Sequence, residues 1–152
     1  MGTSPSLETT FLVRDSCLCL HLQRAARTLA RRFDDAFRPL GLTNGQFFLM
    51  MSLNRSEPAE MGAVASLLGM DRTTLTAALK PLRRRGLVKI TVDPADHRSH
   101  IMTLTLKGRR LLSRAVPVWK EVQVQIEAQL PAGEPERFRK DLRAVSLIRD
   151  WK

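Results

Sequence analysis

Long hydrophobic segments are missing from this sequence. No uninterrupted apolar run reaches about 18 residues, the length that a membrane-spanning helix requires. The first residues, MGTSPSLETT, also lack the basic start and apolar centre of a secretory signal. We therefore expect a cytoplasmic protein with no membrane partner.

Cysteine and histidine are scarce, which limits the chemistry open to the chain. The two cysteines, Cys17 and Cys19, are too close together for a useful disulfide framework, and they fit a reducing compartment. The histidines His21, His97 and His100 are scattered and no Cys-x-x-Cys pair accompanies them, so neither a metal site nor a cofactor is expected. A glycine-rich phosphate loop and a G-x-S-x-G motif are absent too, so we do not expect an enzyme.

Negative charge is also in short supply. The chain has 25 Lys and Arg against 15 Asp and Glu, a formal net charge of +10. The excess is concentrated, because residues 71–110 hold ten Lys or Arg and three Asp, a net of +7. A compact basic protein attracts polyanions, of which nucleic acid is the commonest. The alternative is a generally cationic surface that only keeps the protein soluble.

The hydrophobic spacing predicts a mainly α-helical chain with one small β-hairpin, which is an α+β class. Apolar residues recur every three or four positions in several segments, and Val, Ile and Thr are enriched in two others. The 152 residues suit one domain, and residues 1–10 suit a mobile arm. The expected helices span about 16–40, 44–54, 61–68, 72–84, 107–129 and 135–149, and the expected strands span 87–92 and 100–106.

Local signals mark the ends of these elements. Thr43 and Asp71 are expected N-caps, because their side-chain oxygens can accept hydrogen bonds from the first helical turn. Gly86 is expected to end the 72–84 helix. Pro81 lies inside that helix, and we keep the helix because its apolar period continues through the proline.

The first helix and the last two are amphipathic and lie at the two ends of the chain. They would be buried most simply against their copies in a second subunit. The prediction is therefore a homodimer that presents two reading helices to a pseudo-palindromic DNA site. The alternative is that these helices cover a monomeric core.

The 72–84 helix and the hairpin after it carry the predicted DNA chemistry. Threonine can hydrogen-bond to base edges and touch thymine methyl groups, and arginine can pair with guanine or hold phosphate. Arg83 to Arg85 equally suit a structural role at the helix end. The predicted contacts on the helix are Arg72, Thr73, Thr74, Thr76, Lys80 and Arg84.

At the hairpin tip, Arg98 is the main candidate, because a planar guanidinium fits a narrow minor groove. Ser99 beside it is a second candidate contact. Asp93 and Asp96 are interpreted as turn-forming residues, and Asp96 is expected to orient Arg98 through a charge-assisted hydrogen bond.

Four segments, GLTNGQFFLMMSL, LLGMDRTTLTAALKPLRRRGLV, DPADHRS and LTLKGRRLL, resemble in that order the MarR family of multiple antibiotic resistance regulators. The resemblance covers about residues 15–130 and departs from the family pattern at Arg83 and Ile90. It implies a homodimeric winged helix-turn-helix transcription factor, usually a repressor relieved by a small ligand or an oxidant. The DNA-binding module would be residues 43–106, with dimerisation helices in 11–42 and 107–152.

Two kinds of effector remain open. Cys17 and Cys19 are candidates for oxidant sensing, since Arg14 one turn earlier favours a thiolate, although the family's peroxide sensors also use tyrosine and this chain has none. The alternative is that they are two small buried hydrophobic residues. A small aromatic or lipophilic effector would instead bind in a pocket lined by His21, Phe47, Met50 and Trp119. The alternative is that these side chains are ordinary members of the hydrophobic core.

Two other functions compete with a sequence-specific regulator. An architectural protein that binds DNA without sequence preference would share the charge and the hairpin. A protein–protein adaptor without DNA binding is a third reading, which the threonine-rich helix disfavours.

Overall fold

The computed structural model describes residues 4–131 and 134–147. Its elements are α1 (Leu7–Ser16), α2 (Leu18–Phe37), η1 (Arg38–Leu40), α3 (Asn44–Ser52), β1 (Ala59–Glu60), α4 (Met61–Leu68), α5 (Arg72–Arg84), β2 (Val88–Val92), β3 (His100–Leu104), α6 (Leu106–Glu127) and α7 (Pro135–Ser146). The class is the predicted one, mainly helical with a small antiparallel sheet of order β1-β3-β2.

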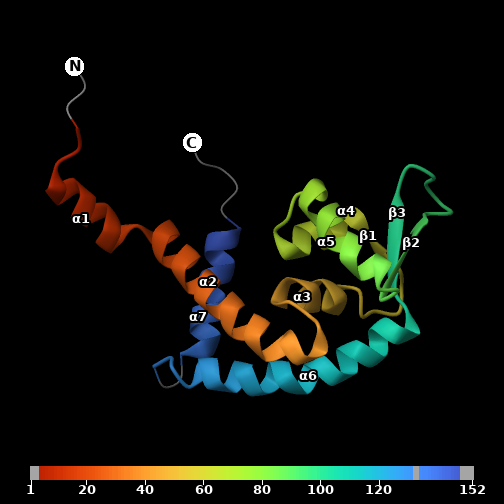
Figure 1. The fold of residues 1–152 in the computed structure, drawn as a ribbon. Helices are drawn as coiled ribbons and strands as arrows, with labels where there is room; N and C mark the ends of the chain where they lie inside the picture. The colour runs from red at the N-terminus through yellow and green to blue at the C-terminus, as the bar shows by residue number, and fades with distance from the viewer. Residues whose placement is uncertain (1–3, 132–133, 148–152) are drawn as a thin grey trace.

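The helices divide into two regions joined by α6 (Figure 1). α3, α4, α5 and the sheet form one region, which we call the reading module, residues 43–106. α1, the start of α2, and α7 form the other region, at the opposite end of α6 and near both chain ends. The β2–β3 hairpin projects from the reading module on the side away from the terminal helices.

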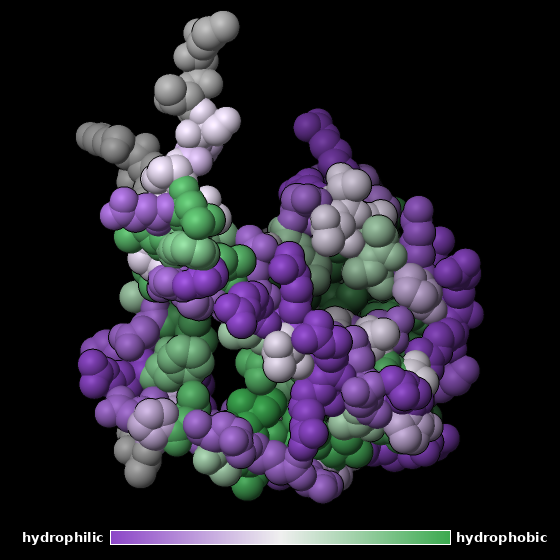
Figure 2. Space-filling model, turned by 60° about the vertical axis from the view of Figure 1, so that its left-hand side comes forward, coloured by the Kyte–Doolittle hydropathy of each residue, from purple (hydrophilic) through white to green (hydrophobic). Residues whose placement is uncertain are grey.

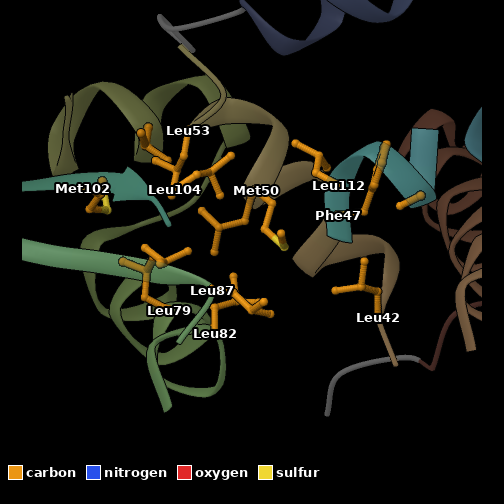
Figure 3. Close-up of a cluster of buried hydrophobic side chains, with 14 of the residues drawn as sticks. Leu42, Phe47, Met50, Leu53, Leu79, Leu82, Leu87, Met102, Leu104 and Leu112 are labelled. Carbon is orange, nitrogen blue, oxygen red and sulfur yellow. The ribbon is translucent and has the colours of Figure 1, made fainter. Parts of the chain in front are cut away.

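The core lies inside the reading module and extends to the places where α2 and α6 pack against α3. Phe37 and Phe47 stack there with ring centroids 4.7 Å apart, and α5 contributes one buried face. Figure 3 shows side chains from α3, α5, the sheet and α6 converging on this cluster. Its labelled members include Leu42, Phe47, Met50, Leu53, Leu79, Leu82, Leu87, Met102, Leu104 and Leu112.

Helix ends in the reading module follow the sequence signals. Thr43 caps α3 in a capping box with Gln46. Asp71 caps α5, as predicted. Gly69 and Gly86 adopt left-handed φ values of 63° and 68° just after α4 and α5, a conformation that glycine adopts without strain.

The N-terminal prediction was wrong in two respects. Residues 7–10, assigned to a mobile arm, form the first part of α1, because Ser6 caps the helix by accepting a hydrogen bond from Thr9 N. The expected continuous helix from about residue 16 is interrupted at Cys17, whose φ and ψ of −74° and 105° are extended.

Two details of the middle region also differ from expectation. β1 was not predicted, and it pairs Ala59 and Glu60 with Met102 and Ile101 of β3. The apolar spacing of the 61–68 helix favours an inward position for Leu67, but this side chain is 71% exposed.

Candidate nucleic-acid interface

α5 presents a polar face because its apolar residues are committed to the core. Leu75, Leu79 and Leu82 are buried, which turns the side of the helix that carries Thr73 and Lys80 outward. A shallow hollow of about 300 Å³ lies on this outward side. It is lined by Arg72, Thr73, Thr76, Ala77 and Lys80.

Four of the five lining residues of this hollow were predicted DNA contacts, and Ala77 was not. Ala77 follows Thr73 by one helical turn, so helical periodicity alone was enough to find it. Thr76 Oγ1 donates a hydrogen bond of 2.8 Å to Arg72 O, and the residue is exposed, so its hydroxyl oxygen can still accept a hydrogen bond.

The first turn of α5 is fixed by its cap. Asp71 Oδ1 accepts a 2.7 Å hydrogen bond from Thr74 N, and this bond is the main reason that the pKa of Asp71 lies below its ordinary value. The exposed side chains of Thr73 and Thr74 are therefore held on a well-formed helical turn.

The three arginines at the end of α5 have different surroundings. Arg85 donates a 2.6 Å hydrogen bond to Gly41 O, and its own carbonyl accepts one from Lys107 Nζ at 2.8 Å. Arg85 therefore ties α5 to the loop after η1 and to α6. Arg83 and Arg84 are exposed, and the contact predicted between Arg84 and DNA stays a prediction.

The hairpin tip is a network of turn hydrogen bonds. Asp93 Oδ1 accepts from Ala95 N at 2.8 Å, and Ser99 N donates to Asp96 O at 2.8 Å. Asp96 Oδ1 accepts from Arg98 N at 3.0 Å and its Oδ2 accepts from Ser99 Oγ at 2.9 Å. These two bonds keep the pKa of Asp96 below its ordinary value.

This network confirms the turn-forming role of both aspartates and corrects one expectation. Asp96 holds the backbone N–H of Arg98, not its guanidinium, so the exposed Arg98 side chain is left to project from the tip. Ser99 is half-buried and its hydroxyl donates to Asp96, so this side chain helps to form the turn at the tip. Its predicted contact with DNA stays a prediction.

The base of the hairpin is anchored on α6 by the L-T-x-x-G segment. Thr105 Oγ1 donates to Gly86 O at 2.7 Å and accepts from Gly108 N at 3.0 Å, so one hydroxyl caps α6 and holds the end of α5. A Cβ on Gly108 would lie 2.2 Å from Leu87 O, so only glycine permits this approach of α6 to β2.

The cysteines lie at the junction of α1 and α2. Cys17 is the half-buried residue at the break, and Cys19 is exposed in the first turn of α2, where its Sγ accepts a 3.2 Å hydrogen bond from Gln23. Arg14 does not reach them, because it makes two hydrogen bonds to Asp15 at 2.6 and 2.8 Å. The predicted cationic setting for a thiolate is therefore weakened.

Of the four predicted pocket residues, three lie together in or against the core, and His21 lies apart from them. Phe47 and Met50 are buried in the core, Trp119 is half-buried against it, and His21 is exposed on α2, its Nε2 3.1 Å from Asp15 O. Sequence reasoning missed a different hollow of about 430 Å³ between α2 and α6. It is lined by Arg32, Asp35, Ala36, Val118, Glu121, Val122 and Gln125.

The terminal helices leave apolar side chains uncovered. α1 and α7 bury no residue within this chain. Phe138, Leu142 and Val145, spaced along one face of α7, are 42%, 36% and 42% exposed. Figure 2 shows hydrophobic surface along the column of helices that carries the chain ends and in the hollow beside it. In the sequence the same apolar spacing continues to Ile148, which lies outside the described residues.

The part of the chain that the structure describes, residues 4–131 and 134–147, lacks two features. No helix there is both long enough and apolar enough to cross a membrane. In the same ranges, no group of three or more His, Cys, Asp or Glu is arranged to hold a metal ion.

Comparison with known proteins supplies independent evidence. A model of the MarR family matches residues 40–99. The transcriptional regulator HosA of Escherichia coli O157:H7 is 30% identical over 108 residues, which cover 71% of this chain and 76% of HosA.

Solved structures agree with that match. The transcriptional regulator MosR of M. tuberculosis, solved in complex with DNA, is 39% identical, with a TM-score of 0.79 and coverage of 86% of this chain and 94% of MosR. BpsR of Bordetella bronchiseptica, whose DNA binding is regulated by 6-hydroxynicotinic acid, is 25% identical, with a TM-score of 0.79 and coverage of 88% and 96%.

Proposed function

This chain belongs to the MarR family, and on that premise we propose that it is a dimeric, sequence-specific, DNA-binding transcriptional regulator, most simply a repressor. The observation that carries the proposal is the outward face of α5, where hydroxyl and cationic side chains line one hollow beside a projecting hairpin. Thr73, Thr76 and Lys80 would meet the major groove and its phosphates, and Arg98 the adjacent minor groove. MosR, a relative of the same fold, has been solved with DNA.

A homodimer follows from the uncovered terminal helices. The apolar faces of α1 and α7 have no cover in one chain, and a second copy supplies one of matching composition. Two copies also double the number of base pairs read, which a regulator needs for useful specificity. The family and the relatives named above are transcription regulators, which gives no support to an enzymatic role.

The test is binding of the full-length protein to the DNA that flanks its own gene. A regulator should prefer this DNA over random duplex of equal length by about 10³-fold or more, with a footprint of two symmetric half-sites. Affinity should fall roughly 10³- to 10⁵-fold between about 50 and 200 mM salt if eight to ten phosphates are contacted. Equal affinity for both duplexes would favour the architectural alternative.

The effector is proposed to be a small ligand or an oxidant. The regulation of BpsR by 6-hydroxynicotinic acid supports the first class. For such a ligand, the hollow between α2 and α6 is an alternative site to the four predicted pocket residues. Thermal-shift and DNA-release measurements with 6-hydroxynicotinic acid would test this class of ligand directly.

An oxidant would act at the α1–α2 junction, where Cys17 breaks the helix and Cys19 is exposed. Oxidation of either sulfur places a larger polar group at the start of a helix proposed to lie in the dimer interface. Peroxide should then release DNA from the wild type but not from Cys17→Ser or Cys19→Ser, with mass spectrometry locating the modification. Release from both variants would rule out the cysteines.

A further inference from the structure

The β2–β3 hairpin has no net formal charge at neutral pH, although the whole chain carries +10. Residues 88–104 contain Lys89 and Arg98 against Asp93 and Asp96, so the charges cancel. The same segment contains His97 and His100, two of the three histidines in the chain. Protonation of both imidazoles would change the hairpin from neutral to a charge of +2.

Both histidines lie where a duplex would meet the hairpin. His97 directly precedes Arg98 in the tip, and His100 is the first residue of β3, opposite Val92 of β2. Both are exposed, and within residues 4–131 and 134–147 neither imidazole has a hydrogen-bond or ion-pair partner. Each can therefore meet a phosphate without first breaking a contact within the protein.

The acidic groups of the hairpin are already committed to its backbone. Asp93 accepts from Ala95 N, and Asp96 accepts from Arg98 N and from the hydroxyl of Ser99. The same bonds lower the pKa of Asp96, so this group remains a carboxylate across the range in which histidine ordinarily titrates. Asp96 therefore keeps its negative charge throughout that pH range.

The neighbouring elements bring few other charges toward the tip. β1 contributes Glu60, which is in register with Ile101 next to His100. Lys89 lies opposite Thr103, toward the base of the hairpin. α5 and α6 meet the sheet at that base, where Arg84 ends α5 and Lys107 donates to Arg85 O. Within the described structure, Glu60 is therefore the one acidic residue outside the hairpin that this sheet places beside either histidine.

We propose that His97 and His100 are two further DNA contacts and that they bind phosphate in their protonated form, so that the hairpin strengthens DNA binding chiefly at mildly acidic pH. The inference rests on the proposed function, because it assumes that the hairpin meets a duplex. A phosphate next to an imidazole favours the protonated form, so binding takes up protons and affinity rises as the pH falls.

The experiment is a fluorescence-polarisation titration of the full-length protein with a labelled duplex from the DNA flanking its gene. It is run at about pH 5.8 and about pH 7.8 at constant ionic strength, on either side of the ordinary histidine range. Wild-type affinity should be about tenfold higher at the lower pH or more, since one unit of pKa shift on binding is a factor of ten. The DNA affinity of the variant H97Q/H100Q should rise by less than about twofold between the higher and the lower pH, because this variant lacks both imidazoles.

Two further variants sharpen the result. His21→Gln removes the remaining histidine, which lies on α2 outside the reading module, and should keep the full wild-type gain. H97K/H100K carries the two charges permanently, so at the higher pH it should bind as tightly as wild type does at the lower pH. The salt dependence of wild-type binding should also be steeper at the lower pH, by about 0.9 per phosphate gained.

The possible failures are distinguishable. A pH-dependent gain that survives in H97Q/H100Q, or disappears in His21→Gln, overturns the histidine contacts and leaves the proposed function intact. Equal wild-type affinity at both pH values also overturns the histidine contacts and leaves the proposed function intact. Absence of DNA binding at either pH contradicts the proposed function itself, and this inference with it.

Discussion

Gly108 shows how one residue sets the position of the DNA-binding hairpin. Its backbone lies so close to Leu87 O that a Cβ would come within 2.2 Å of that oxygen. Thr105 completes the junction by capping α6 and donating to Gly86 O. The spacing between Thr105 and Gly108 is therefore explained by the close packing of α6 against Gly86 and Leu87, which the sequence motif alone does not show.

We expect Gly108→Ala to lower the free energy of unfolding by about 1–3 kcal/mol, the usual cost of overpacking. Urea unfolding at a fixed protein concentration measures the change. Gly45→Ala is the matched control, because a Cβ there meets nothing within 4 Å and Gly45 also lies in a helix. The control should be neutral or slightly stabilising, by less than about 1 kcal/mol. Equal destabilisation of both variants would contradict the close-contact argument.

Arg98 is the residue whose removal should affect DNA binding most directly. Its backbone N–H is fixed by Asp96 while its side chain is exposed, an arrangement suited to insertion into a groove. Arg98→Ala should weaken operator binding by about 10- to 100-fold without changing the melting temperature. Arg114→Ala, which removes an exposed arginine of α6, is the control and should change affinity less than about threefold. Similar losses in both variants would indicate a general charge effect.

At the scale of elements, the sequence predicted what local patterns encode. The bounds of α4 and α5 agree with the predicted spans, because Asp71 and Gly69 are strong local signals. β1 could not be predicted, since a strand of two residues has no period and exists only through pairing with β3. The break at Cys17 was missed because the apolar spacing before and after it suits one continuous helix.

The sequence predicts the parts of the candidate site that depend on neighbouring residues in one helix. It does not predict the parts that depend on turn geometry or on tertiary packing. The outward residues of α5 follow from the helical period, and the structure brings Arg72, Thr73, Thr76 and Lys80 together as the period predicts. The orientation of Asp96 toward a backbone N–H depends on turn geometry that side-chain chemistry alone does not specify. Phe47 and Met50 have aromatic and flexible apolar side chains of the kind that lines ligand pockets. Only the packing of α3 on its neighbours shows that both are buried in the hydrophobic core.

The cap of α5 gives a prediction at this scale. Asp71 accepts a hydrogen bond from Thr74 N, and its folded pKa is lowered, so its stabilising contribution is present above the ordinary carboxyl range and is lost as the pH falls through the folded value. Asp71→Ala should therefore lower the melting temperature by a few degrees at pH 7. The difference from wild type should shrink as the pH falls below about 4.

Asp71→Ser is the control for the cap, because a hydroxyl accepts the same hydrogen bond without a charge. It should keep most of the wild-type stability at pH 7 and of the wild-type DNA affinity. Melting curves recorded from about pH 3 to 7 and a DNA titration measure both properties. A penalty for Asp71→Ala that is constant across this range would show that the negative charge of Asp71 adds nothing to the cap.

The whole molecule combines a basic reading module with terminal helices that remain uncovered in one chain. α6 connects the two, running from the hairpin anchor at Thr105 to the end where Arg139 of α7 bonds Glu127. We therefore expect a change in how the terminal helices pack to be transmitted to the reading module through α6. Only the folded chain shows which apolar stripes its own core leaves free.

The exposed apolar face of α7 gives a prediction that tests the proposed dimer. Leu142→Glu places a carboxylate in the middle of the exposed apolar face of α7, so it should weaken the dimer at least about tenfold while the reading module stays folded. Lys140→Glu introduces the same group on the opposite side of α7 and should leave the dimer unchanged. Sedimentation equilibrium measures the association, and DNA binding should weaken in parallel, because a monomer reads one half-site. A dimer of Leu142→Glu with wild-type stability would show that α7 lies outside the subunit interface.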